Sequence, residues 1–421
     1  MVLKETIKEV IFDQTILYSQ KKLYHRKKLN EIPDDDEITI ISGIRRCGKS
    51  TLLNQIRFLS KEKDYFINFD DDRLINFEVE DFQALYEIFI ELFGKQKHFY
   101  FDEIQNIKGW ERFVRRLHDY GNKIYITGSN AYMLSNELGT HLTGRYYHIE
   151  LYPFSFNEFL GYRKIKFSED MFFSTEGKSQ LLKYYKEYQK YGGFPEFLKN
   201  KNKDYLKSLY ESIIYRDVLV KNKITNEKQI LELVHYIVSN VSGLVSYNGL
   251  TNVIDVKNAT TVKEYLKYLS DTYLIFLLNK YDYSLKKQIQ NPKKVYFIDN
   301  ALANIIGFYF SENKGHILEN TVFLELKRRA KNLFYHRNKK ECDFVITEKR
   351  KVVEVIQVSV NLFDEKTRKR EIEGLYEAME MYDLKEGLII TEDERETVDY
   401  QNKIINVIPV WEWMLRPGND K

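Results

Sequence analysis

A glycine-rich segment, GIRRCGKST at residues 43–51, combines residue types that bind phosphate groups. It follows a short β-type run at 37–42 and precedes an apolar run at 52–59 that is typical of a helix. A G-x-x-x-x-G-K-S/T pattern in that context indicates a phosphate loop, because its glycines let backbone N–H groups approach the oxygens. A fortuitous glycine turn before a helix is the alternative. The pattern predicts that a nucleoside triphosphate, ATP, contacts Gly43, Ile44, Arg45, Arg46, Cys47, Gly48, Lys49, Ser50 and Thr51.

Within this loop, we expect Lys49 to reach the β- and γ-phosphates and the Ser50 hydroxyl to ligate Mg²⁺. An acidic pair, Asp102 and Glu103, ends an aromatic β-type run that starts at residue 98. Triphosphate hydrolysis needs one carboxylate for the Mg²⁺ shell and another that orients or deprotonates the attacking water. Asp102 is therefore predicted to hold the metal and Glu103 to act on the water. A solvated strand end is the alternative.

Two further positions could contact the γ-phosphate. The β-type run at 122–129 ends in the polar residues Thr127, Ser129 and Asn130. Ser129 or Asn130 could sense the phosphate, although both also suit the cap of a following helix. Arg145 precedes the last β-type run of this region. It could stabilise the transition-state charge, in its own chain or on a neighbouring subunit, or pair with an acid at the surface.

Length and composition narrow the class of protein. A chain of 421 residues is too long for one core and indicates two or three domains. Lys+Arg 65 against Asp+Glu 62 gives a formal charge of +3, so only local clusters could indicate nucleic acid. The two cysteines, Cys47 and Cys342, are not spaced for zinc, and no apolar run suits a signal peptide or a membrane span. A cytoplasmic protein is expected, and an exposed Cys47 would make ATP binding sensitive to thiol reagents.

Short β-type runs alternate with helix-type segments between residues 37 and 151. The runs are apolar on both faces, which indicates an α/β fold with a parallel sheet covered by helices on each side. From about residue 154 to 290 helical patterns dominate, and after about 316 the pattern is mixed α/β again. The sequence therefore predicts an α/β core, a helical middle and a second α/β domain.

Five segments, taken in order, resemble a large prokaryotic family of AAA-type P-loop ATPases with a C-terminal domain of unknown function. The segments are GIRRCGKSTLL, FDEIQNIKGWE, ITGSNAYML, LTGRYYHIELYPFSFNEF and YGGFPEF. The resemblance spans nearly the whole chain. It implies a core of the AAA/ASCE type with strand order 5-1-4-3-2, then a winged-helix-like part and a nuclease-like (restriction-endonuclease-like) α/β part. The predicted domains are an N-terminal helical segment at 1–36, the ATPase core at 37–153, a helical lid at 154–202, the winged-helix-like domain at 203–295 and the nuclease-like domain at 296–421.

The middle region carries a helix-turn-helix pattern at residues 247–278. In its second helix, apolar residues recur at the helical period on one face: Val262, Tyr265, Leu266 and Leu269. Lys263 and Lys267 lie on the other face, where they could meet phosphates. The continuation predicts a hairpin wing that carries Lys286, Lys287, Lys293 and Lys294. Winged helices bind protein as well as DNA, so both partners stay open.

The last domain has the layout of a PD-(D/E)xK nuclease, with Glu319 on a helix and Asp343 on a strand as ligands of a possible second metal ion. The next strand, however, reads Gln357-Val-Ser359 where Glu-x-Lys would stand. Lys366 or Lys369 could replace the missing lysine. A nuclease-derived fold kept for binding is the interpretation we favour over an active enzyme.

Basic residues interleaved with aromatics lie at 327–340, a pattern that suits phosphate neutralisation and base stacking. A solvated helix end followed by an edge strand would look the same. The predicted nucleic-acid contacts are Lys327, Arg328, Arg329, Arg337, Lys339 and Lys340. A second basic stretch, KKLYHRKKL at 21–29, is predicted to be an amphipathic surface helix.

Together these patterns predict an ATPase that uses ATP and Mg²⁺ and whose nucleotide state acts on a C-terminal module that binds nucleic acid or protein. A nucleotide-gated, Mg²⁺-dependent nuclease is one alternative. A non-catalytic, ATP-dependent switch that acts on a protein partner is another. The oligomeric state stays open.

Overall fold

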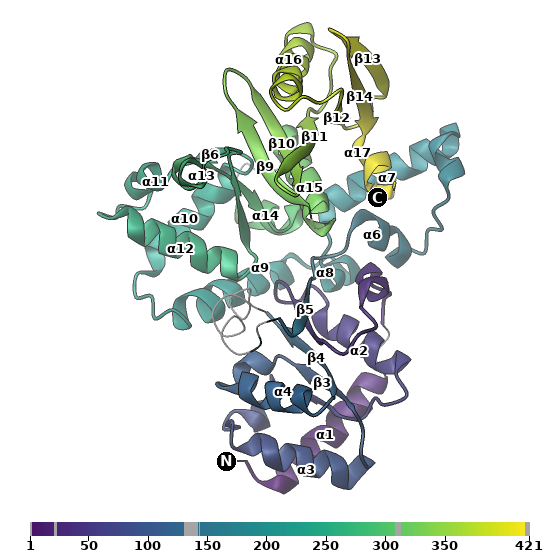
Figure 1. Cartoon of the computed structure of the whole chain (residues 1–421), viewed down its shortest axis with the longest axis vertical. Helices are drawn as coiled ribbons and strands as arrows, with labels where there is room; N and C mark the ends of the chain where they lie inside the picture. Colours follow the sequence, from purple (N-terminus) through teal and green to yellow (C-terminus); the bar gives the residue numbers. More distant parts are fainter. Residues whose placement is uncertain are drawn as a thin grey trace. The chain divides into compact units, whose positions relative to one another are not determined.

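The computed structural model describes residues 2–20, 23–129, 142, 144–307, 313–329 and 331–416 of the 421-residue chain. The chain divides into two compact units. Unit 1 comprises residues 1–152 and 271–273, and unit 2 comprises residues 153–270 and 274–421. In Figure 1, unit 1 is drawn mainly in purple and blue, and unit 2 in teal, green and yellow.

The described residues of unit 1 form one sheet of five parallel strands in the order β2-β3-β4-β1-β5. Their bounds are β1 Ile38–Ser42, β2 Phe66–Asn68, β3 His98–Asp102, β4 Lys123–Gly128 and β5 Tyr146–Glu150. Read from the other edge, this is the 5-1-4-3-2 order that the family resemblance implied, so the predicted α/β core is confirmed. Parallel strands end at the same edge of a sheet, and here the carboxyl ends of β1, β3 and β4 are brought together.

Helices cover both faces of this sheet (Figure 1). Their bounds are α1 Lys4–Ser19, α2 Lys49–Leu59, α3 Asp81–Phe93 and α4 Trp110–Asp119, with 3-10 turns η1 Lys27–Glu31, η2 Asp72–Leu74 and η3 Ile104–Asn106. Side chains alternate along a strand, so Phe99 and Phe101 of β3 face a core shared with α1, α3 and α4. Phe66 of β2 lies on the opposite face, where the guanidinium of Arg57 from α2 is 4.4 Å from its ring centroid.

Unit 2 begins with helical structure, as predicted. The bounds are α6 Phe156–Tyr162, η5 Glu169–Phe172, α7 Thr175–Tyr191, α8 Pro195–Asn200, α9 Lys203–Ser212 and a π-helical segment η6 Ile213–Val220. Helix α6 starts at a capping box, in which Ser155 accepts from the Glu158 N–H and Glu158 accepts from the Ser155 N–H. Such local contacts fix the start of a short helix that its own propensity would not hold.

The next elements form a winged helix. In chain order they are α10 Glu227–Ser239, β6 Leu244–Val245, α11 Tyr247–Val253, α12 Ala259–Asp271, β7 Ile275–Asn279, α13 Leu285–Gln290 and β8 Lys293–Phe297. The three strands pair antiparallel in the order β6-β8-β7. The buried residues of α12 are the predicted apolar face, Val262, Tyr265, Leu266 and Leu269.

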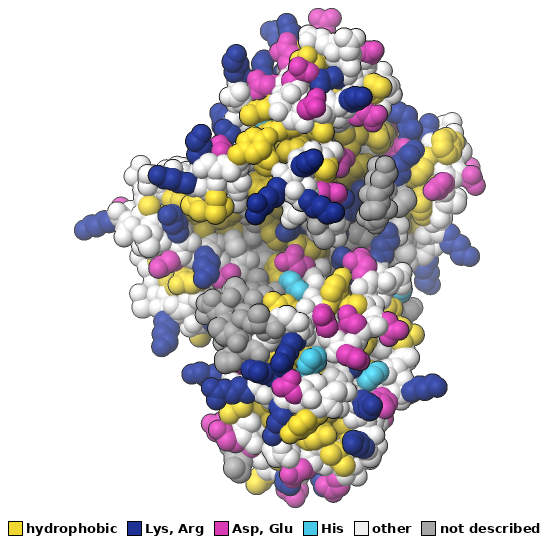
Figure 2. Space-filling model, in the orientation of Figure 1, with side chains coloured by type: hydrophobic (Ala, Val, Ile, Leu, Met, Phe, Trp, Pro, Cys, Tyr) yellow, Lys and Arg dark blue, Asp and Glu magenta, His cyan; other side chains and the backbone are white. Residues whose placement is uncertain are grey.

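The C-terminal elements form a mixed sheet with the order β13-β14-β12-β11-β10-β9 among the described residues. Its strands are β9 Asn332–Arg337, β10 Glu341–Glu348, β11 Lys351–Val358, β12 Glu386–Thr391, β13 Glu396–Tyr400 and β14 Lys403–Pro409. The helices are α14 Asn300–Ile306, α15 Lys314–Arg328, α16 Glu365–Met381 and α17 Val410–Leu415. Figure 2 shows side chains of both charge signs interspersed over this region. Within the described ranges, no helix combines the length and apolar character that a membrane crossing requires.

Candidate functional site

The loop after β1 is shaped by two glycines that no other residue could replace without strain. Gly43 has φ 153°, and a Cβ built there would lie 2.0 Å from the Leu151 carbonyl oxygen. Gly48, the residue before α2, has φ 106°, in the region that favours glycine. The backbone N–H groups at the start of α2 therefore line a close-fitting cradle at the positive end of the helix.

A buried arginine from the N-terminal region supports this cradle. Arg26 is 2% exposed, and its guanidinium donates to the carbonyl oxygens of Cys47 at 2.5 Å and Tyr152 at 2.7 Å. The predicted surface helix at 21–29 is therefore wrong where the structure describes it, because the chain is irregular at 23–26 and continues as the 3-10 turn η1. Lys21 and Lys22 lie outside the described residues.

Cys47 is fully buried, and its thiol donates to the Leu151 carbonyl oxygen at 3.2 Å. Burial raises the pKa of the Cys47 thiol, against the lowering effect of Lys49 and Arg26. The reactive form of cysteine is the thiolate, so the condition for the predicted sensitivity to thiol reagents is not met.

Lys49 is 3% exposed, and its ammonium donates to the Ile44 carbonyl oxygen at 3.3 Å. The same ammonium lies 3.6 Å from a carboxylate oxygen of Glu103. The predicted phosphate-binding lysine and the predicted acid for the water thus meet in one site, although 54 positions separate 49 from 103 in the sequence.

Asp102, the predicted metal ligand, is completely buried at the end of β3. Burial, and then the neighbouring Glu103 carboxylate, raise the pKa of Asp102 to about 6; the hydroxyls of Thr127 and Ser50 and the Lys49 ammonium act in the opposite direction. Its Oδ1 accepts from the Thr127 hydroxyl at 2.5 Å, whereas its Oδ2 has no hydrogen-bond partner among the described residues. A buried carboxylate oxygen without a partner, next to the Ser50 hydroxyl, fits a site for a hard divalent cation.

Thr127 joins the two acids, a role that the sequence did not assign. Its hydroxyl donates to Asp102 and accepts from the backbone N–H of Glu103 at 3.0 Å. Glu103 itself has φ 53°, in the left-handed region that is strained for a residue with a side chain. Strain of this kind persists where surrounding contacts enforce it, and it is concentrated at functional sites.

The other predicted phosphate contacts are placed differently. Ser129 is buried just beyond β4, and Asn130 lies outside the described residues. Arg145 precedes β5, whose first residue pairs with Ile38 at the amino end of β1, so it lies at the sheet edge opposite the phosphate loop. Its guanidinium forms a 2.5 Å ion pair with Asp119. Within its own chain Arg145 thus pairs with Asp119, an acid at the surface, and its contact with phosphate from a neighbouring subunit stays a prediction.

Tyr273 is a further residue at this site that the sequence did not indicate. Residues 271–273 fold with unit 1, and the Tyr273 hydroxyl is 2.5 Å from that of Ser42, the last residue of β1. Ser42 also contacts His148 Nε2 of β5 at 2.7 Å. No motif marks such a tyrosine, because its partner is 231 positions away in sequence.

In unit 2, the predicted pair Glu319 and Asp343 does converge, but with a lysine between the two carboxylates. Lys294 Nζ lies 3.0 Å from Glu319 Oε1 and 2.7 Å from Asp343 Oδ1. Neither candidate from the segment after β11 supplies this lysine: Lys366 is exposed, and Lys369 lies 3.8 Å from Glu373 on α16. Lys293 and Lys294 lie on β8, which pairs antiparallel with β7 as the predicted hairpin requires, but both side chains are buried.

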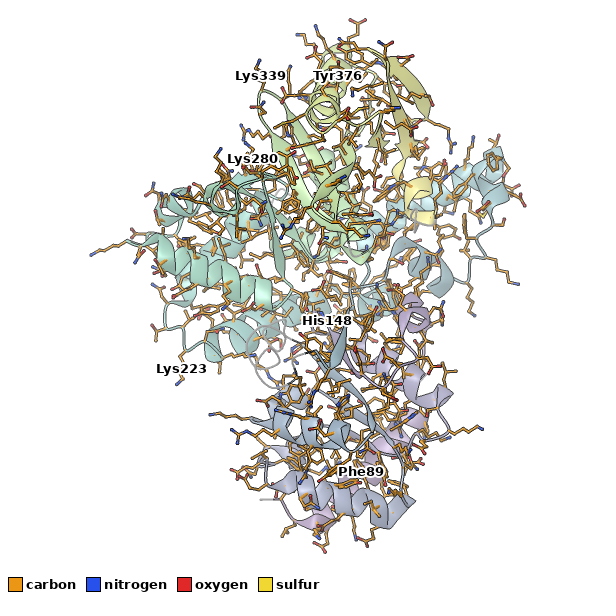
Figure 3. The ribbon with its side chains drawn as sticks, in the orientation of Figure 1. Phe89, His148, Lys223, Lys280, Lys339 and Tyr376 are labelled. Atoms are coloured by element: carbon orange, nitrogen blue, oxygen red, sulfur yellow. The ribbon has the colours of Figure 1, made fainter. Side chains whose placement is uncertain are left out.

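The predicted basic cluster divides into two groups. Arg328 and Arg329 pair with Glu325, and Arg329 also donates to the Trp413 carbonyl oxygen at 2.9 Å. These two arginines hold the fold of unit 2 together, so their assignment to nucleic acid is wrong. Lys327 is partly buried on α15. The exposed group, which we call the hairpin cations, consists of Arg337, Lys339 and Lys340 at the turn between β9 and β10, where Figure 3 shows Lys339 near the tip.

The phosphate loop, the acidic pair and the strand order of unit 1 define an AAA-type P-loop ATPase domain. In agreement, a family described as "AAA domain" matches residues 35–160. Two families described as domains of unknown function, DUF8612 and DUF4143, match residues 182–311 and 314–413.

An uncharacterized protein of Methanocaldococcus jannaschii is 37% identical over an alignment that covers 98% of this chain and 96% of that protein. An uncharacterized protein of Haemophilus influenzae is 30% identical, over an alignment that covers 93% of this chain and 97% of that protein. The chain belongs to the family that these proteins represent, and it carries an AAA-type domain, a fold that implies nucleotide binding.

Among solved structures, AMPPCP-bound DnaA from Aquifex aeolicus is 15% identical, with a TM-score of 0.25. The alignment covers 59% of this chain and 86% of the DnaA chain. Orc1 from Aeropyrum pernix, in complex with DNA, is 10% identical, with a TM-score of 0.27. The alignment covers 72% of this chain and 91% of the Orc1 chain. TM-scores this low do not describe a shared arrangement of whole chains, so the nucleotide and the DNA in those structures are properties of those proteins.

Proposed function

We propose that unit 1 hydrolyses ATP with Mg²⁺ and that the nucleotide state controls binding of nucleic acid by unit 2. The observation that supports ATP hydrolysis is the buried Oδ2 of Asp102, which has no hydrogen-bond partner among the described residues. This oxygen lies close to the Ser50 hydroxyl and to the Lys49–Glu103 ion pair. A structural ion pair would not need this carboxylate oxygen left open, whereas a cation site does.

Each residue of the site has a role in this reaction. Lys49 and the loop N–H groups hold the β- and γ-phosphates, while Ser50 and Asp102 are the protein ligands for Mg²⁺, which when bound neutralises charge on the phosphate oxygens. Lys49 has to turn from Glu103 toward phosphate, so nucleotide binding releases the Glu103 carboxylate to orient and deprotonate water. Thr127 fixes the backbone of Glu103 through the 3.0 Å bond from its N–H.

Retention of labelled ATP and release of phosphate test this assignment. Lys49→Ala should abolish retention, whereas Lys61→Ala, at an exposed position in the same unit, should not. Glu103→Gln should retain ATP and lose phosphate release by about 10²- to 10⁴-fold, the usual contribution of a general base. Retention that survives Lys49→Ala, or turnover that survives Glu103→Gln, would remove these residues from the mechanism.

The proposed binding of nucleic acid by unit 2 is based on the hairpin cations. They are the residues of the predicted basic cluster whose side chains are exposed. Arg337 is 55% exposed and Lys340 is 45% exposed at their side chains, so both can reach a phosphate backbone. Arg337→Glu with Lys339→Glu should weaken binding of nucleic acid and reduce its salt dependence, because fewer counterions are released. The matched control reverses two exposed lysines of the same unit, Lys178→Glu with Lys223→Glu. Equal losses in both double variants would point to non-specific charge or to a protein partner.

A further inference from the structure

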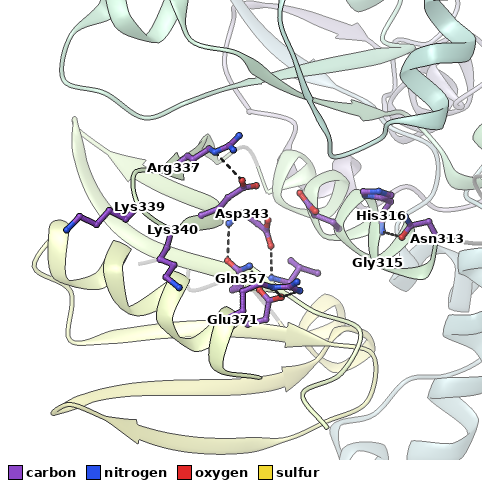
Figure 4. A pocket seen from close by; sticks show the side chains of 13 residues that line it. Asn313, Gly315, His316, Arg337, Lys339, Lys340, Asp343, Gln357 and Glu371 are labelled. Atoms are coloured by element: carbon purple, nitrogen blue, oxygen red, sulfur yellow. Dashed lines mark hydrogen bonds and ion pairs between the residues drawn. The ribbon is translucent and has the colours of Figure 1, made fainter. Parts of the chain in front are cut away.

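A cavity of about 600 Å³ opens in unit 2 beside the hairpin cations. Figure 4 shows Arg337, Lys339 and Lys340 on one side, His316 on the other, and Asp343 between them. The acidic side chains that line it are Glu319, Glu341, Asp343 and Glu371. A metal-dependent phosphodiesterase needs carboxylates that bind a metal ion next to a basic surface that binds the substrate. Whether this cavity could cleave a phosphodiester therefore depends on which cation pairs with its carboxylates.

Lys294 pairs with three of these four carboxylates, and Arg370 pairs with Glu371. The Lys294 ammonium lies 2.7 Å from Asp343, 2.9 Å from Glu341 and 3.0 Å from Glu319. An ammonium group has three N–H donors, so one donor is available for each carboxylate. Burial alone would lower the pKa of Lys294, but the charges of Asp343 and Glu319 outweigh that effect and hold it well above its usual value. The lysine is therefore a fixed positive charge at the centre of the acidic group.

The backbone keeps this charge in place. Lys294 is 2% exposed on β8, the central strand of its sheet, and pairs with Leu244 of β6 and Leu278 of β7. A metal ion at the same carboxylates would have to displace the ammonium and leave it buried without partners, which costs far more than a surface rearrangement. A divalent cation placed beside the ammonium would be repelled by it at short range.

Asp343, Gln357 and Glu371 make further contacts with protein groups. Asp343 Oδ2 accepts from the Val358 N–H at 2.9 Å, and the Asp343 N–H donates to Gln357 Oε1 at 3.2 Å. Gln357 Nε2 donates to Glu371 at 2.5 Å. The neutral Gln357 thus stands where a third metal-binding carboxylate would be required, and it links the neighbouring acids instead of competing for a cation.

We propose that Lys294 is a resident cation that takes the place of a divalent metal, so that this cavity binds the phosphodiester backbone of nucleic acid on the hairpin cations without a metal and without cleaving it. The partner class rests on the proposed function of unit 2. The replacement of the metal by Lys294 rests on the contacts of β8, α15 and β10 alone.

Mn²⁺ binding followed by electron paramagnetic resonance tests the resident cation. The measurement uses Asp102→Asn proteins without nucleotide, so that the site of unit 1 does not contribute. Removing the ammonium in Lys294→Met should create a site for about one additional Mn²⁺, because Glu319 and Asp343 then lose the cation that pairs with them. The matched control is Lys293→Met, which removes the neighbouring buried ammonium; that group donates to the Gln288 and Ile289 carbonyl oxygens and, within the described part of the chain, to no carboxylate. A Mn²⁺ site already present with Lys294 intact, and lost in Asp343→Asn, would overturn the proposal.

A second measurement uses the unmodified chain without nucleotide, and a variant is needed only to assign any cleavage. Nucleic-acid binding should be the same in EDTA and in Mg²⁺, and the bound nucleic acid should stay intact. Loss of binding in EDTA, or cleavage that Mg²⁺ starts and Asp343→Asn stops, would refute metal-free binding. If nucleic acid fails to bind under all conditions, the proposed partner is wrong, while the Mn²⁺ measurement still decides the role of Lys294.

Discussion

The buried Asp102 makes a quantitative prediction for the protein without nucleotide. Its pKa is raised from 3.8 to about 6, first by burial and then by Glu103. The folded protein therefore binds this proton more tightly than the unfolded chain does. The sign follows: folding is favoured while the carboxyl is protonated, and the free energy of unfolding falls as pH rises from the unfolded pKa through about 6.

The shift of about 2 pKa units corresponds to about 3 kcal/mol at 1.36 kcal/mol per unit. Asp102→Asn removes the titration but keeps the size of the side chain and an oxygen that can accept from Thr127. The stability of Asp102→Asn relative to the unmodified protein should therefore rise with pH, with about half of the 3 kcal/mol developing between about pH 5 and about pH 8. An amide N–H without a partner would add a constant cost of about 1–3 kcal/mol, so the slope with pH is the quantity to compare.

Hydrogen exchange of peptides from β1 and β3, followed by mass spectrometry in EDTA and corrected for the intrinsic rate at each pH, measures this local free energy. Asp36→Asn, at an exposed position of the same unit, is the control and should show no pH-dependent difference. A stability difference between Asp102→Asn and the unmodified protein that is independent of pH, or that falls as pH rises, would show that Asp102 is not held as a protonated group and would refute the reasoning.

Three further outcomes follow from contacts around the phosphate loop. Arg26→Met removes two hydrogen bonds from a buried charged donor, so unit 1 should lose about 3 kcal/mol or more of stability in urea unfolding and bind ATP more weakly; unchanged ATP affinity would show that the loop does not depend on this support. Thr127→Val removes a hydrogen bond that lowers the pKa of Asp102, so the acid limb of the pH–rate profile for phosphate release should move to higher pH; an unmoved limb would separate Asp102 from the rate. N-ethylmaleimide should leave ATP retention intact in the native protein, because Cys47 is fully buried, and rapid loss of retention would contradict that burial.

The core of the ATPase domain could be predicted because its signals are local. Residues 43–51 carry loop, lysine and hydroxyl in one stretch, and the strand and helix on either side confirm the context. The apolar face of α12 was readable for the same reason, since helical period alone places Val262, Tyr265, Leu266 and Leu269 together. The helix assigned to residues 21–29 failed because charge pattern and helical propensity cannot reveal that Arg26 is a buried donor.

The positions of Arg145, Arg328 and Arg329 depend on tertiary contacts, as do the residues that the sequence did not indicate. Arg145 lies at the far end of β5 because the parallel register pairs β5 with β1 from its first residue, and register is not encoded in any single strand. The sequence predicts nucleic-acid contacts for Arg328 and Arg329, because a count of basic residues does not reveal that both pair with Glu325.

By itself, the sequence determined which residues could carry nucleotide chemistry, since a phosphate loop and an acidic strand end are specified by neighbours in the chain. The tertiary structure alone decided what surrounds them: Arg26 meets a carbonyl 126 positions away, and Lys294 meets Asp343 49 positions away. A buried charge is stable only where partners from distant elements compensate it, and such partners are chosen by packing rather than by sequence proximity. For that reason the sequence places Lys294 on a hairpin wing but does not reveal that its side chain is buried among carboxylates.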